Sequence, residues 1–148
     1  MNNCGLIFTP DKSKYLFRIS WLSLFSSIYA IKCGHYDMAV VPGGIFLTSI
    51  NHWRNPAFIS WRRTCDIYYV RAGLLYQLIR SYNAQYAKKY YLCTLLGISF
   101  FPVSWYYYNK RQYWKSVISH GMLHAICNVA NVILYTGYIP STRFSSVF

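Results

Sequence analysis

The stretch YYLCTLLGISFFPVSWYYY, residues 90–108, decides the fold class of this chain. An apolar run, residues 92–103, lies between paired tyrosines at one end and a Trp-Tyr-Tyr-Tyr run at the other. Aromatic residues at both ends of an apolar segment of this length are typical of a helix that crosses a membrane. We therefore expect residues 90–108 to form a membrane-spanning helix that is bent at Pro102.

The composition of the whole chain extends this expectation. The 148 residues are 55% hydrophobic, 20% aromatic and only 12% charged, whereas soluble domains have about 25% charged residues. The sequence predicts an all-α, polytopic membrane helix bundle that forms a single domain, residues 1–148. Five stretches are long enough to cross or nearly cross a bilayer: residues 15–32, 38–53, 64–80, 90–108 and 117–139.

The first stretch also has features of a signal peptide, because it follows Lys12, Lys14 and Arg18 and is interrupted by serines. We expect it to be retained, because its basic lead is long and small hydroxyl residues suit contacts between membrane helices. The second stretch contains Pro42 and two glycines, which membrane helices tolerate where neighbours satisfy the freed backbone groups.

The net charge of +12 reflects the scarcity of acids, which are Asp11, Asp37 and Asp66. By the positive-inside rule, the side with more basic residues is cytoplasmic, so the N-terminus is predicted to lie there and the C-terminus opposite. Basic loops beside membrane helices meet anionic lipid headgroups, so we expect membrane lipid and no nucleic acid as a partner. In the five-span arrangement, the N-terminal side has Lys12, Lys14, Arg18, Arg54, Arg62, Arg63, Lys110, Arg111 and Lys115, and the other side has Lys32, Arg80, Lys88, Lys89 and Arg143.

The cysteines do not predict a disulfide framework or a thiolate zinc site, because they are odd in number and never form a CxxC pair. Cys127 follows His124 by three residues, and we do not count it among the metal ligands. The five cysteines are Cys4, Cys33, Cys65, Cys93 and Cys127.

Two of the four histidines, His120 and His124, are one helical turn apart and so share a helix face. In the N-inside arrangement, the second stretch ends on the cytoplasmic side, where the third and fifth begin. His52 lies at the end of the second stretch and Asp66 near the start of the third. Four ionisable groups are therefore predicted to collect at one depth in the membrane, where such groups indicate function.

Three imidazoles and a carboxylate at one depth match a catalytic zinc site, which needs three protein ligands, an open position for water and a base. Thr48 and Ser49 lie about one turn before His52, so a hydroxyl can face the same cavity. Asn128 and Asn131 continue the face of the histidine pair, and such a polar stripe favours the interior of a bundle over contact with lipid.

Each of these residues also has a purely structural interpretation. The histidines would hydrogen-bond across helices and hold the bundle together. Asp66 would be a helix N-cap, with Arg62 or Arg63 nearby. Thr48 and Ser49 would bond their own backbone, as hydroxyls in membrane helices often do.

Three segments together resemble the CREST superfamily of membrane hydrolases, which includes alkaline ceramidases and the progestin and adiponectin receptor family. They are TSINH at residues 48–52, DIY at residues 66–68 and SHGMLHAICNVANVILYTG at residues 119–137. The family typically has seven helices, whereas this chain has room for five. The resemblance implies that His52, His120 and His124 bind zinc, that Asp66 positions or deprotonates the zinc water, and that Ser49 or Thr48 supplies a hydroxyl.

Two classes of function follow. The first is a zinc-dependent integral membrane hydrolase, similar to a ceramidase, that acts on a lipid amide or ester. Arg71 would lie inside the membrane, where it pairs with Asp66, snorkels, or binds an anionic headgroup of the lipid substrate. The second is a non-catalytic membrane scaffold or receptor-like protein with structural histidines or a structural zinc. A transporter is disfavoured, because the five stretches show no inverted repeat.

Overall fold

The computed structural model describes residues 5–140, which form helices and short connections. No strand forms within this range, where Leu6 and Ala57 make only an isolated bridge. The expected all-α class is therefore confirmed. The helices are α1 (Pro10–Ile19), α2 (Trp21–Lys32), α3 (Tyr36–Trp53), α4 (Trp61–Arg80), α5 (Ala87–Asn109) and α6 (Tyr113–Tyr135).

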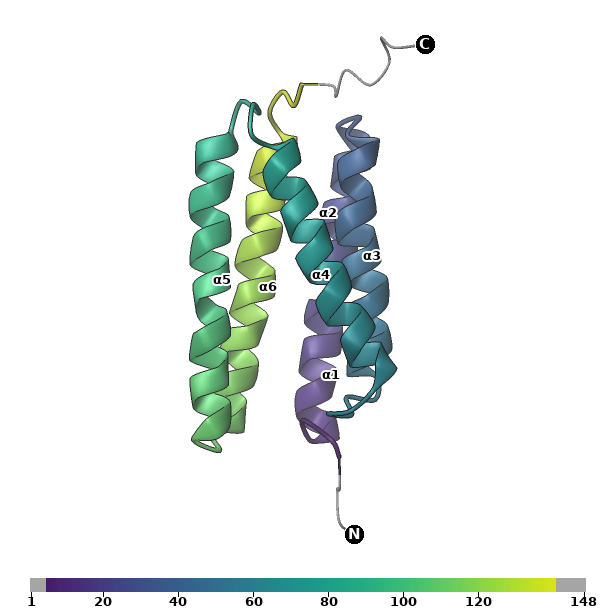
Figure 1. The fold of residues 1–148 in the computed structure, drawn as a ribbon, viewed down its shortest axis with the longest axis vertical. Coiled ribbons are helices and arrows are strands. Elements are labelled where there is room, and N and C mark those ends of the chain that lie inside the picture. The colour runs from purple at the N-terminus through teal and green to yellow at the C-terminus, as the bar shows by residue number, and fades with distance from the viewer. Residues whose placement is uncertain (1–4, 141–148) are drawn as a thin grey trace.

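These helices make five passes along the length of the molecule (Figure 1). Helices α1 and α2 follow one another in a single pass, because the backbone at Ser20 between them stays helical. Each later helix runs opposite to the one before it, so the chain starts at one end of the bundle and finishes at the other. The five passes correspond to the five stretches expected from the sequence, and the first pass begins earlier, at Pro10.

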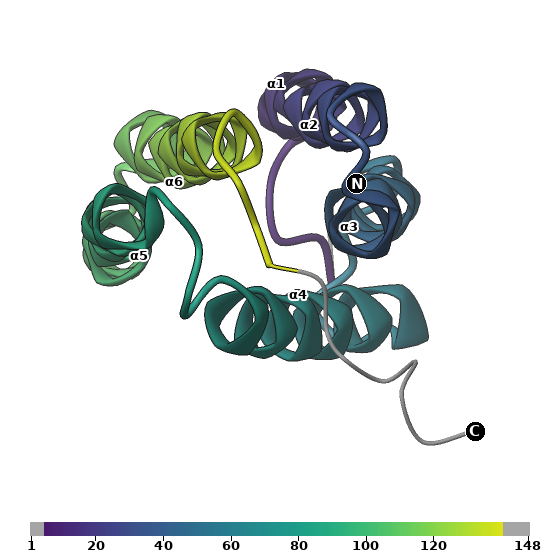
Figure 2. The ribbon, with the colours of Figure 1, turned by 90° about the horizontal axis from the view of Figure 1, so that it is seen from above.

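Seen along the bundle, the helices form two groups (Figure 2). Helices α5 and α6 pack on each other along their whole length, while α1, α2 and α3 form the other group. Helix α6 also contacts α1 and α2, and α4 packs mainly on α3. Helix α5 continues through Pro102 as one helix. His120 on α6 lies next to α3, because its ring is 5.4 Å from the ring of Trp53.

The interior of the bundle is rich in small polar residues, while its surface is rich in large apolar ones. Buried polar residues within residues 5–140 are as numerous as buried hydrophobic ones, and most of them are serines. By contrast, Val40, Leu47, Leu92, Leu95 and Ile79 all have more than 60% of their surface exposed. Large contiguous apolar surfaces mark contact with a membrane or with another protein.

Length and composition single out one candidate membrane span among the described helices, which is α6. These two criteria therefore do not support the prediction of five spans. The N-cap interpretation of Asp66 is wrong, because α4 begins at Trp61 and Ser60 is its N-cap, accepting a hydrogen bond from Arg63 N at 3.2 Å. Cys4 and Arg143 lie outside the described residues.

Candidate functional site

Helices α3 and α4 approach closely because glycines remove side chains at two points of their contact. A β-carbon on Gly44 would overlap the ring of Tyr69, and one on Gly73 would lie 2.6 Å from Cγ1 of Val41. The Tyr69 hydroxyl crosses to α3 and donates to the carbonyl of Val40 at 2.9 Å. This antiparallel register places the middle of α3 against the first half of α4.

One turn further along the same contact, two hydroxyls of α3 bind the carboxylate of Asp66. Thr48 Oγ1 and Ser49 Oγ each donate to Asp66 Oδ1 at 2.8 Å. Ser49 is fully buried, while Thr48 and Asp66 are half-buried. Thr48 Oγ1 also lies 3.2 Å from the carbonyl of Ile45. Both hydroxyls expected from the sequence therefore meet Asp66, and they hold the same oxygen atom.

The three expected histidines lie near one another in a row that also includes a tryptophan. The His52 ring is 4.5 Å from the Trp53 ring, which is 5.4 Å from the His120 ring, measured between centroids. The His120 and His124 rings are 5.1 Å apart. His52 comes one turn after Ser49 on α3, so the histidine row begins close to the Asp66 carboxylate.

The arrangement of these side chains is not that of an assembled metal site. Within the described residues, no group of three or more His, Cys, Asp or Glu side chains is placed to hold a metal ion. The donor types nevertheless suit zinc, which prefers imidazole nitrogen. In addition, Nδ1 of His52 is buried and has no hydrogen-bond partner among residues 5–140. A zinc ion would have to draw the three rings together.

A buried hydrogen-bond network fixes α6 behind the histidine pair. Asn128 Nδ2 donates to the carbonyl of His124 at 2.8 Å and to Ser23 Oγ at 3.3 Å. In return, Ser26 Oγ donates to Asn128 Oδ1 at 2.6 Å. Asn128 thus joins α2 to α6 next to His124, as the polar stripe on this helix face predicts.

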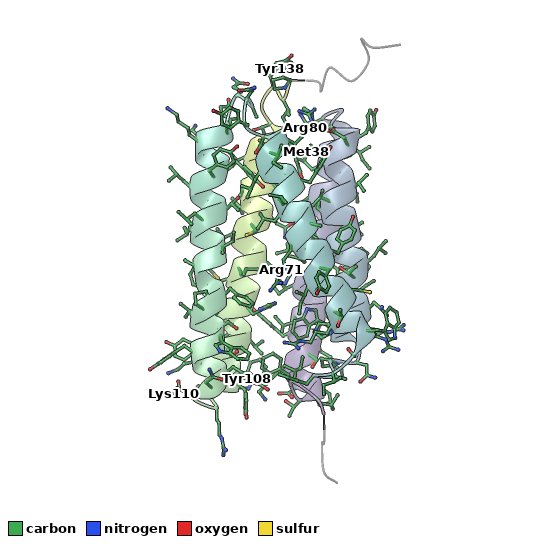
Figure 3. All side chains as sticks on the ribbon, viewed as in Figure 1. Met38, Arg71, Arg80, Tyr108, Lys110 and Tyr138 are labelled. Atoms are coloured by element: carbon green, nitrogen blue, oxygen red, sulfur yellow. The ribbon has the colours of Figure 1, made fainter. Side chains whose placement is uncertain are left out.

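Arg71 lies near mid-height of the bundle (Figure 3) and is exposed. No ion pair between Arg71 and Asp66 forms in the described structure, where the ion pairs are Lys12 with Asp11 and Arg80 with Asp37. Of the three roles expected for this arginine, pairing with Asp66 is the one the geometry disfavours.

The opposite end of the α3 and α4 contact carries a separate ionic cluster. Arg80 Nε donates to Asp37 Oδ2 at 2.7 Å, and the Tyr76 hydroxyl donates to the same oxygen at 3.1 Å. Burial alone would raise the pKa of Asp37, but the hydrogen bond and charge of Arg80 lower it below its ordinary value of 3.8. Arg80 also donates to the carbonyl of Pro140, so this cluster anchors the end of the described chain.

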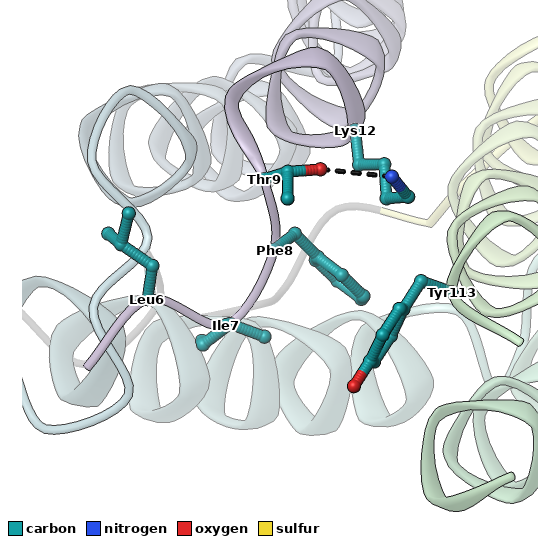
Figure 4. A pocket seen from close by; sticks show the side chains of 6 residues that line it. All are labelled: Leu6, Ile7, Phe8, Thr9, Lys12 and Tyr113. Carbon is teal, nitrogen blue, oxygen red and sulfur yellow. Dashed lines mark hydrogen bonds between the residues drawn. The ribbon is translucent and has the colours of Figure 1, made fainter. Parts of the chain in front are cut away.

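The segment before α1 covers the end of the bundle where His52 and Trp53 lie. Ile7 N donates to the carbonyl of Pro56 at 2.8 Å, and the Phe8 ring stacks on Trp53 at a centroid distance of 6.1 Å. A small pocket of about 150 Å³ lies between this segment, Lys12 and Tyr113 (Figure 4). Sequence reasoning missed Trp53 and Phe8, because nothing in a sequence separates an inward-facing aromatic residue at a helix end from one in a membrane interface.

No family model, curated protein or solved structure matches the chain. The resemblance to the CREST superfamily therefore stays a prediction that rests on the three quoted segments.

Proposed function

We propose that the chain is a multi-pass membrane protein that hydrolyses a lipid amide or ester with the help of zinc. The observation that carries the proposal is the pair of hydrogen bonds that Thr48 and Ser49 donate to Asp66, about one turn from His52. A carboxylate anchored beside a row of three histidines is the arrangement that a metal-dependent hydrolase requires.

The distribution of side chains supports a position inside the membrane. Leu92, Leu95 and Ile79 each expose more than 60% of their surface. Exposing this much apolar surface is unfavourable in water and is not unfavourable among lipid tails. The buried serines suit close contacts between membrane helices. The predicted orientation has the end with Lys110 in the cytoplasm and the end with Arg80 opposite (Figure 3).

The histidine row would provide the zinc ligands, from His52, His120 and His124. Zinc at this position would supply a Lewis acid for the scissile carbonyl and make water acidic enough to ionise near pH 7. The unpartnered Nδ1 of His52 supports this assignment, because a buried ring nitrogen without a partner is costly unless a ligand or a metal binds it.

Asp66 would accept the proton of the attacking water. Its Oδ1 is occupied by the hydroxyls of Thr48 and Ser49, while Oδ2 receives no hydrogen bond from the described residues. The two hydroxyls thus fix the orientation of the carboxylate and leave its second oxygen for the proton. A carboxylate held in this way loses little freedom when it acts as a base.

A lipid would approach Asp66 from the surface formed by α2, α3 and α4. A shallow, mostly apolar groove of about 570 Å³ lies there, and its lining includes Val40, Leu47 and Tyr69. Thr48 also lines this groove and binds Asp66, so the groove reaches the proposed base. Arg71 has no acidic partner among the described residues and would bind an anionic headgroup.

The first test is the metal content of the purified protein in detergent. We expect about one zinc per chain in the wild type and a large loss in His52→Ala and His120→Ala. His35→Ala is the matched control, because His35 precedes α3 at the other end of the bundle, and it should keep the zinc. A well-folded wild type without zinc would refute the metal site.

The second test is hydrolysis of long-chain lipid amides and esters by the Asp66→Asn variant. The amide oxygen can still accept from Thr48 and Ser49, so the variant should fold and retain zinc while losing turnover. Asp37→Asn, in the ionic cluster at the opposite end, is the control and should keep its activity. Full activity of Asp66→Asn would exclude this carboxylate as the base.

A second candidate function is a non-catalytic membrane protein whose histidines are structural. The observation that favours it is that no three potential ligands among residues 5–140 are placed to hold a metal ion. In that case His52→Ala and His120→Ala should lower the stability of the bundle, and neither zinc nor lipid hydrolysis should be found in the wild type.

A further inference from the structure

Two neighbouring residues of α3 have buried polar atoms without a hydrogen-bond partner among residues 5–140. They are Nδ1 of His52 and the indole Nε1 of Trp53. The two residues are only 3% and 6% exposed. Because both lie at the end of α3 that faces α6, the two unpartnered atoms belong to one place in the molecule.

Aromatic rings surround Trp53, whose N–H has no partner among residues 5–140. Phe8 stacks on one side of the indole, at a centroid distance of 6.1 Å and an angle of 27° between the rings. The His52 ring lies 4.5 Å away and the His120 ring 5.4 Å away. Phe8 has no acceptor atom, and neither imidazole accepts the indole N–H in this arrangement.

An indole N–H is a donor only, and leaving a buried donor unsatisfied is unfavourable. If the Trp53 side chain only filled space, phenylalanine would serve there without the free-energy cost of an unsatisfied N–H. The N–H therefore points to a ligand that brings an acceptor atom into the histidine row. The acceptor has to be small and accessible, as a carbonyl or carboxylate oxygen is.

We propose that the indole N–H of Trp53 donates a hydrogen bond to the acyl oxygen of the bound lipid. The choice of this ligand rests on the proposed function, because the carbonyl of a lipid amide or ester is the group that has to reach the histidine row. Trp53 thereby orients the carbonyl before hydrolysis and holds the carboxylate of the fatty acid afterwards. This role adds a substrate-binding residue to the site.

The test uses palmitate as the probe, together with protein in which the five tryptophan indoles are labelled with ¹⁵N. We expect palmitate to shift the Trp53 N–H signal more than the other four. Hexadecyltrimethylammonium, which has a chain of the same length and no acceptor oxygen, should leave this signal in place. Trp53→Phe should bind palmitate about tenfold more weakly, the loss expected for one hydrogen bond to a charged acceptor.

The matched control is Trp61→Phe, at an indole that is 66% exposed at the start of α4. This variant should bind palmitate as the wild type does. If Trp53→Phe does not fold, the Trp53 signal can be assigned by replacing the other four tryptophans one at a time, so the shift is still measured. Unchanged affinity in folded Trp53→Phe, or an equal shift with hexadecyltrimethylammonium, would overturn the inference.

The outcome separates this inference from the proposed function. A protein without zinc or hydrolase activity that still shows the Trp53 shift with palmitate has the acyl-oxygen site and is not a hydrolase. A zinc-containing hydrolase whose Trp53→Phe variant keeps its kcat and KM has the proposed function without the Trp53 contact.

Discussion

Gly44→Ala should destabilise the protein, because the added methyl group would overlap the ring of Tyr69 on α4. Forcing an extra methyl into a packed contact costs about 1–3 kcal/mol. Displacing the ring also breaks the hydrogen bond from the Tyr69 hydroxyl to Val40, which is 2.9 Å long and contributes about 1 kcal/mol. Alanine in a helix is favoured over glycine by about 1 kcal/mol. The net expected loss in the free energy of unfolding is therefore about 1–3 kcal/mol.

The same substitution should have the opposite sign when Tyr69 is absent. In the Tyr69→Ala background neither the overlap nor the hydrogen bond exists, so Gly44→Ala should stabilise the protein by up to about 1 kcal/mol. Unfolding by denaturing detergent measures all four corners of this double-mutant cycle. A coupling of about 2–4 kcal/mol is expected from the overlap and the hydrogen bond together.

Gly43→Ala is the matched control, since its methyl group would meet only the side chain of Ser27, with Oγ at 3.0 Å. Its effect should be smaller than that of Gly44→Ala and independent of Tyr69. If Gly44→Ala destabilises the wild type and the Tyr69→Ala variant equally, the close contact between α3 and α4 is not as described. The register that brings Thr48 to Asp66 would then lose its basis.

Three further predictions concern other contacts. Asn128→Leu should lower the unfolding free energy by about 1–2 kcal/mol, and adding Ser26→Ala should cost little more, because Asn128 accepts the Ser26 hydrogen bond; full additivity would contradict the network. The lowered pKa of Asp37 means that its contribution to stability is present above its ordinary value of 3.8 and is lost as the pH falls further; unfolding measured between about pH 6 and pH 3 should show this loss, and Asp37→Asn should remove it. Gly97→Ala should destabilise the α5 and α6 pair by about 1–3 kcal/mol, because its β-carbon would lie 2.6 Å from the Cys127 sulfur; no relief of this loss in a Cys127→Ala background would contradict the contact.

The helices could be predicted from the sequence because each pass is a long apolar stretch bounded by polar or aromatic residues. The five segments match the observed passes to within a few residues, apart from the earlier start at Pro10. The sequence did not predict the start at Pro10, because one side of α1 is polar and the segment is therefore not a continuous apolar stretch. Proline at the first position of a helix is a signal that would have found it.

The sequence could predict the candidate site only as far as the directions of the helices determine how deep in the bundle each residue lies. Opposite directions of α3 and α4 are enough to bring residues near Thr48 to the level of Asp66. They do not determine which of two adjacent hydroxyls faces the carboxylate, and in the structure both do. The position of the Trp53 ring beside His120 depends on rotamers and on Phe8. Helical periodicity in the sequence predicts neither the rotamer of Trp53 nor the position of Phe8.

The serine-rich interior also has a consequence for how the bundle tolerates mutation. In most water-soluble domains the core consists of large side chains, and truncating them is the damaging change. Here Ser20 and Ser116 are almost completely buried, so neither position has room for a large side chain. A scan to alanine should therefore find these positions tolerant, whereas a scan to leucine should find them sensitive. Genetic variation in this chain would be limited by the lack of space between its helices rather than by the loss of apolar contacts.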